Sequence, residues 1–145
     1  MTTKSEAGEQ PAAQAERLRM ASFGALTMLI LQFALGTAYN LYGTAPTASK
    51  SIGMFSSSLL AVHVILGILI VIAAIMLVFR AVQAKARTIL ITSVIGLLAV
   101  LGAAGAGSAF IGKGDSGASL GMALATAIAM LCYAANLVIL GKPRG

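Results

Sequence analysis

The residue with the clearest chemical potential in this chain is His63, its only histidine. Gly67 follows four residues later, so a helix would place both residues on one face. A histidine ring can hold a haem iron as an axial ligand, and a neighbouring glycine leaves room for the flat porphyrin. The same ring can form a structural hydrogen bond to another membrane helix. Both interpretations of His63 are open on the sequence alone.

Haem b is the candidate cofactor under the first interpretation. The cofactor-binding residues would be His63, Gly67 and Met122, with His63 as the iron ligand. Met122 is expected at a similar depth on the last helix. Tyr39 on the first helix and a second His63 from a dimer are the alternative second ligands.

Acidic and sulfur ligands are scarce, which excludes several mechanisms. The four acidic residues lie outside the long apolar stretches, so no intramembrane carboxylate is present for acid–base catalysis or proton-coupled transport. Cys132 is the only cysteine, so a His and Cys cluster for zinc is excluded. The sequence therefore favours a protein that is not an enzyme.

Two helices are expected to carry a small polar face. These residues are Gln32, Gly36, Tyr39, Asn40 and Gly43 on the first helix, and Cys132, Tyr133 and Asn136 on the fourth. Polar groups that faced lipid would stay unsatisfied, so we expect both faces to point into the bundle and to form interhelical hydrogen bonds. A transport path is the alternative interpretation.

Four stretches without Lys, Arg, Asp or Glu must position these side chains, at 20–49, 51–79, 88–112 and 116–141. Each is mainly apolar and exceeds the roughly 20 residues that a helix needs to cross a bilayer. The sequence predicts an all-α integral membrane protein, a four-helix up-down-up-down bundle over 19–141. Its spans are expected at about 20–42, 57–80, 88–111 and 117–140. Residues 1–18 are predicted to be a disordered cytoplasmic tail, and 142–145 a second cytoplasmic tail.

The ten basic residues indicate the orientation of these spans. Lys50 and Lys113 fall in the first and third connections, and the other eight fall in the middle connection or outside the outermost spans. The positive-inside rule therefore predicts that both termini and the middle connection lie in the cytoplasm. The expected location is the plasma (inner) membrane. The formal charge of +6 reflects this topology and contact with lipid headgroups, and no nucleic-acid partner is expected.

Small residues recur at helical spacing on two of the predicted helices. They are Gly117, Gly121, Ala125 and Ala129 on the fourth, and Ala99, Ala103 and Gly107 on the third. Smooth faces of this kind let membrane helices approach closely. We expect them to pack inside the bundle or in a homodimer, with a glycine-rich pore lining as the alternative.

Several of these positions together resemble one four-helix half of the haem A synthase family. The resemblance covers about 120 residues and rests on Leu31, Gln32 and Gly36, on His63 with Gly67, and on Arg87 before a Leu- and Gly-rich helix. It implies a four-helix scaffold in which an outer-side histidine binds haem. His63 is the only ligand-type residue that carries over.

The chain also departs from the pattern of that family. Val64 stands where a basic residue follows the histidine, Met122 or Leu124 stands where a second histidine is expected, and the outer loop has no acid. The resemblance therefore implies the scaffold without haem A synthesis. Small four-helix membrane proteins of actinobacteria are similar in the same way.

Rich packing chemistry and sparse catalytic chemistry lead to one expectation of function. We expect a small multi-pass membrane protein in the lipid bilayer that acts as a structural or accessory subunit through helix packing. It would form a homo-oligomer or join a larger membrane complex. The alternative is a haem-b-binding electron-transfer or haem-handling protein with His63 as the axial ligand.

Overall fold

The regular structure of this chain consists of four long helices. The computed structural model describes residues 3–43, 46–47 and 50–142, with the backbone alone for residues 3–11. The helices are α1 (Thr3–Tyr42), α2 (Ser58–Gln83), α3 (Arg87–Lys113) and α4 (Ser116–Gly141). All four are long and apolar enough to cross a membrane, which confirms the predicted class of an all-helical protein with four candidate spans.

α1 is longer than the sequence analysis expects. It begins at Thr3, within the predicted disordered tail, and its apolar candidate span is Ala12–Tyr42. The segment before Arg19 is rich in Ala, Gln and Glu, which are strong helix formers, so the helix extends beyond the apolar part. Most of the predicted C-terminal tail, residues 143–145, lies outside the described residues.

Local signals set the helix ends near the first and third connections. The Ser57 hydroxyl caps α2 by accepting a hydrogen bond from a main-chain N–H of its first turn at 3.3 Å. Gly114 ends α3 with a φ of 66°, in the left-handed region that suits glycine. Asp115 then caps α4 by accepting a hydrogen bond from the Gly117 N–H at 2.8 Å. A Cβ atom at Gly114 would also collide with the Pro46 carbonyl oxygen, so the turn needs glycine on two grounds.

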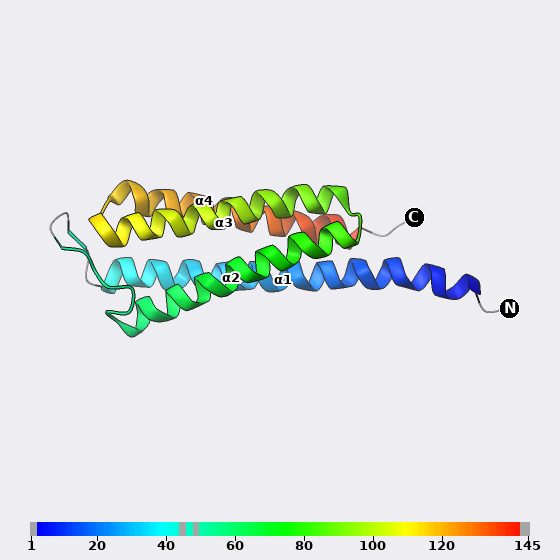
Figure 1. Cartoon of the computed structure of the whole chain (residues 1–145), viewed down its shortest axis with the longest axis horizontal. Coiled ribbons are helices and arrows are strands. Elements are labelled where there is room, and N and C mark those ends of the chain that lie inside the picture. The colour runs from blue at the N-terminus through cyan, green and yellow to red at the C-terminus, as the bar shows by residue number, and fades with distance from the viewer. Residues whose placement is uncertain (1–2, 44–45, 48–49, 143–145) are drawn as a thin grey trace.

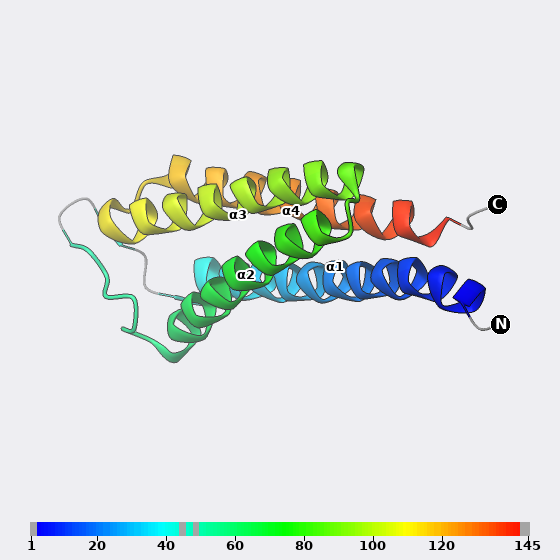
Figure 2. The same cartoon turned by 45° about the vertical axis from the view of Figure 1, so that its right-hand side comes forward.

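The helices form a ring in which α1 and α3 each contact α2 and α4. In Figure 1 and Figure 2, α3 and α4 lie side by side, whereas α2 crosses α1 and diverges from α3 toward its Ser58 end. The two chain ends and the α2–α3 connection lie toward the same end of the molecule in both views. The candidate site lies toward the other end, where α2 and α3 are farther apart.

The most tightly packed apolar core lies toward the α2–α3 connection. Leu18, Leu77, Ala81 and Ile89 are at most 3% exposed and belong to one cluster. On all four helices, large apolar side chains also face outward, and Leu98 is 62% exposed. Helices that are apolar on every side are typical of membrane spans, where lipid covers the outer face.

A buried polar cluster joins α3 and α4 within this half of the bundle. The Asn136 amide nitrogen donates to Ser93 Oγ at 3.2 Å, and the Asn136 oxygen accepts a hydrogen bond from the Thr92 hydroxyl. Tyr133 is fully buried one turn away, against Gly96, where a Cβ atom would lie 2.7 Å from the ring carbon Cε1. The polar face of the fourth helix therefore points into the bundle.

Candidate functional site

His63 forms a polar contact between α2 and α1. Its Nε2 lies 3.1 Å from Nε2 of Gln32, and the amide nitrogen is the donor of this pair. With Nε2 as acceptor, the ring proton resides on Nδ1. Nδ1 of His63 and Oε1 of Gln32 are buried without a hydrogen-bond partner. The arrangement thus matches the structural interpretation of His63, an interhelical hydrogen bond.

Two glycines allow this contact by admitting one polar side chain each. A Cβ atom at Gly36 on α1 would lie 3.0 Å from Cε1 of His63, and one at Gly67 on α2 would lie 3.2 Å from Nε2 of Gln32. Each helix therefore places its polar residue against the glycine of the other helix. We refer to Gln32, Gly36, His63 and Gly67 as the Gln32–His63 clasp.

The clasp changes the role expected for Gly67. The sequence predicts that Gly67 leaves an empty space beside the imidazole, but Gly67 contacts Gln32, and Gly36 is the glycine that lies against the ring. The reason is the antiparallel pairing of α1 and α2, which brings Gln32 opposite Gly67 and Gly36 opposite His63. The sequence contained a signal for this pairing, because a glycine follows each polar residue after four positions: Gly36 follows Gln32, and Gly67 follows His63.

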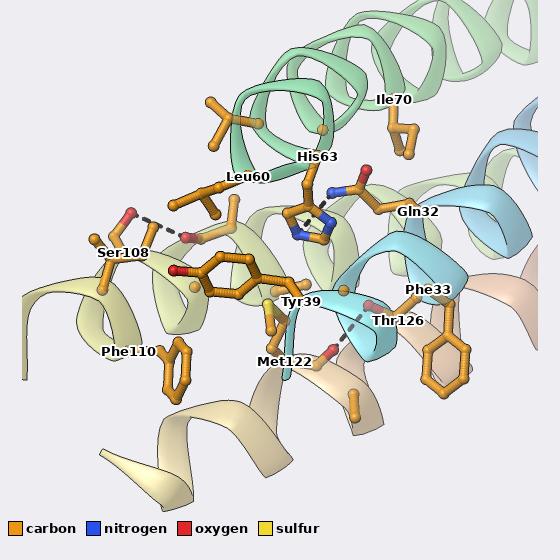
Figure 3. A pocket seen from close by; sticks show the side chains of 18 of the residues that line it. Gln32, Phe33, Tyr39, Leu60, His63, Ile70, Ser108, Phe110, Met122 and Thr126 are labelled. Atoms are coloured by element: carbon orange, nitrogen blue, oxygen red, sulfur yellow. Dashed lines mark hydrogen bonds between the residues drawn. The ribbon is translucent and has the colours of Figure 1, made fainter. Parts of the chain in front are cut away.

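A cavity of about 420 Å³ lies beside the clasp and is lined by all four helices and by Met54 of the first connection. Its walls are mainly apolar, and none of the described residues that line it is charged. Figure 3 shows His63, Tyr39, Phe110 and Met122 around this space. The volume falls within the range of roughly 300–1,000 Å³ that is typical of ligand pockets.

The cavity is a partly open pocket and not a closed void, so molecules that surround the bundle can reach it. Apolar cavities do not attract water, so an apolar molecule from the bilayer is the natural occupant.

The site does not fit an axial haem in this arrangement. Nε2 of His63 faces Gln32, and Nδ1 is buried on the α1 side, where a Cβ atom at Gly36 would lie 3.6 Å away. Neither ring nitrogen presents a free lone pair to the cavity, which iron ligation requires. Met122, the predicted second ligand, lines the same cavity. Haem binding is therefore not supported by this geometry.

The small residues predicted to pack on α3 and α4 occupy several environments. Ala129 is fully buried, Ala103 and Gly107 also line the cavity, and a Cβ atom at Gly121 would lie 3.9 Å from Ala106 on α3. The remaining predicted positions are half-buried at Ala99 and Ala125 and exposed at Gly117. Much of this predicted face is therefore used within the bundle.

A second small-residue face on α3 was not singled out from the sequence. It consists of Gly102, Gly105, Ala109 and Gly112, all exposed, and we refer to it as the outer α3 face. No atom lies within 4 Å of a Cβ placed at any of its three glycines. Spacings of three and four residues were its only sequence signal, and the internal stripe of the same helix, with spacings of four residues, fits a helical face equally well.

Chemistry beyond the clasp is limited in the described part of the chain. Within residues 3–43, 46–47 and 50–142, no group of three or more His, Cys, Asp or Glu side chains is placed to hold a metal ion.

Comparison with known proteins gives no match to this chain from a family model, a curated protein or a solved structure. The resemblance to half of a haem A synthase therefore stays a prediction.

Proposed function

We propose that the protein is a non-enzymatic, multi-pass protein of the plasma (inner) membrane that acts as a structural or accessory subunit through helix packing. Its bundle would have up-down-up-down topology with both termini in the cytoplasm. Its partners would be further copies of this chain or subunits of a larger membrane complex. The outer α3 face is the observation that carries this proposal.

The shape of the outer α3 face favours contact with a helix of a partner protein. Lipid chains gain little from a face without side chains, whereas a second helix can approach it closely and gain van der Waals contacts. The face is open over Gly102, Gly105 and Gly112, whereas a Cβ atom at Gly107 of the internal stripe would lie 3.3 Å from the sulfur of Met122 on α4. A helix of a partner is therefore the fitting cover for this face.

The proposed orientation is supported by the charges at the end of the molecule that carries the chain ends. Arg80, Lys85 and Arg87 are exposed at the α2–α3 connection, which lies at the same end as both termini. Exposed Arg17 and Arg19 flank the buried Leu18 on α1, and Lys142 follows α4. The positive-inside rule assigns such an end to the cytoplasm.

Site-directed crosslinking in native membranes tests the proposed packing. Cys132 is the only cysteine, so a Cys132→Ser background allows a single Ala109→Cys probe on the outer α3 face. Ala127→Cys, which is exposed on α4, is the matched control. We expect Ala109→Cys to form a crosslinked species, identified by mass spectrometry, and the control to form none. Absence of any crosslink from Ala109→Cys, or equal crosslinking from both positions, would contradict the proposal.

A further inference from the structure

The cavity beside the clasp has an occupant of definite chemistry. We propose that it binds a neutral, lipid-soluble ring compound with a carbonyl oxygen, of the isoprenoid quinone class. This inference goes beyond the accessory role and does not depend on it. It is carried by the charge, the composition and the placement of the cavity walls.

The absence of charge from the walls selects a neutral ligand. The described residues that line the cavity include no Lys, Arg, Asp or Glu. A fatty acid carboxylate, a phosphate or an amine in this space would lack a counter-ion inside the membrane, which is strongly unfavourable. The ligand must therefore be a neutral molecule that dissolves in the bilayer.

Ring-shaped side chains are concentrated around the cavity. Phe33, Tyr39 and Phe110 line it, which are three of the eight Phe and Tyr residues of the chain, together with its only histidine. Met54 and Met122 add two flexible thioethers, which pack well against aromatic rings. Aromatic walls favour offset or edge-to-face contacts with a flat ring over contacts with a single hydrocarbon chain.

The Gln32 amide supplies a hydrogen-bond donor for the ligand. The amide nitrogen carries two N–H groups, and the hydrogen bond to His63 uses one of them. Gln32 lines the cavity, and we assign its second N–H, for which no hydrogen bond is seen in the described part of the chain, to a ligand oxygen at this wall. A ring carbonyl accepts this hydrogen bond without breaking the clasp. A haem, in contrast, would need a free ring nitrogen of His63.

The cavity is partly open, and we assign its entrance to the side between α2 and α3. Both helices contribute to the walls, through Val64 and Ile68 on α2 and Ala104 and Ser108 on α3. The two helices separate toward the Ser58 end of α2, as Figure 2 shows. A flat molecule with an apolar tail can therefore enter from the bilayer and leave its tail among the lipids.

A matched pair of probes tests the proposal on the full-length protein in detergent. Menadione and 2-methylnaphthalene share one ring system, and only menadione has carbonyl oxygens. Native mass spectrometry should show menadione binding about 2- to 12-fold more tightly, which is the effect of one neutral hydrogen bond. In Gln32→Leu this preference should disappear, with the affinity for 2-methylnaphthalene retained.

Filling the cavity provides the second arm of the test. Ala103 lines the cavity, so Ala103→Phe should abolish binding of both probes, whereas Ala127→Phe, at an exposed position of α4 away from the cavity, should leave binding unchanged. Equal affinity of the wild-type protein for the two probes, or no binding of either, would overturn the proposal. The comparison of the two probes on the wild-type protein tests the proposal even if Ala103→Phe fails to fold.

Discussion

The Gln32–His63 clasp leads to a quantitative prediction through a double-mutant cycle. Gln32→Leu, His63→Leu and the double variant remove the hydrogen bond singly and together. Interhelical hydrogen bonds in membranes are worth about 0.6 kcal/mol on average and at most about 1.7 kcal/mol. We therefore expect a coupling free energy in this range, equivalent to about 3- to 18-fold in the unfolding equilibrium constant.

The single variants should cost more than the coupling free energy. Each leaves one buried polar group without its partner, and such a group costs about 1–3 kcal/mol. Leucine is close to glutamine in size, so the space over Gly67 stays filled in Gln32→Leu. The double variant removes both polar groups, so its loss should be smaller than the sum of the single losses.

Cys132 offers a built-in reporter for this cycle. It is a half-buried free thiol on α4, so its labelling by a maleimide should follow unfolding across a series of sodium dodecyl sulfate mole fractions. Phe79→Leu is the control: Phe79 is exposed on α2 and about 24 Å along the helix from His63. It should combine additively with Gln32→Leu, within about 0.5 kcal/mol. A coupling free energy of zero between Gln32 and His63 would refute the clasp.

Three further predictions concern packing, cofactor content and topology. Gly96→Ala should destabilise the bundle by about 1–3 kcal/mol because the new Cβ would lie 2.7 Å from the Tyr133 ring. In the same unfolding assay, Gly24→Ala on α1 should be neutral or stabilising by up to about 1 kcal/mol, because no atom lies within 4 Å of a Cβ placed there. Protein purified from haem-replete cells should show no Soret band, and a band lost on substitution of the only histidine would contradict the haem conclusion. Topology can be tested with an impermeant maleimide in a Cys132→Ser background. Lys85→Cys should react only after the cytoplasmic face of the membrane is exposed, whereas Lys113→Cys should react in intact cells. The reverse pattern of labelling would overturn the proposed orientation.

Much of the fold could be predicted from the sequence because membrane insertion depends on local composition. Long charge-free segments are found by counting, and Gly114 and Asp115 mark the turn between α3 and α4 in the sequence itself. The helical segment before Arg19 was missed because its polar composition satisfies the usual criterion for disorder as well as that for helix.

The candidate site shows which of its properties could be predicted from the sequence of single helices and which could not. The sequence identified His63, Gly67 and Met122, and all three line the same cavity. Their roles followed from contacts between helices, which no single helix specifies. Which glycine lies against the imidazole depends on the pairing of α1 with α2, and Gly36 takes the position expected for Gly67.

By itself, the sequence determined that this chain has four helices suited to a bilayer and that its interior has almost no ionisable groups. Both properties depend on which residues are present and in what order along one helix. Tertiary structure decided that His63 bonds to Gln32, that one small-residue stripe of α3 faces α4 while another faces outward, and that a cavity remains beside the clasp. These outcomes depend on the rotation and divergence of neighbouring helices, which are set by packing across the whole bundle.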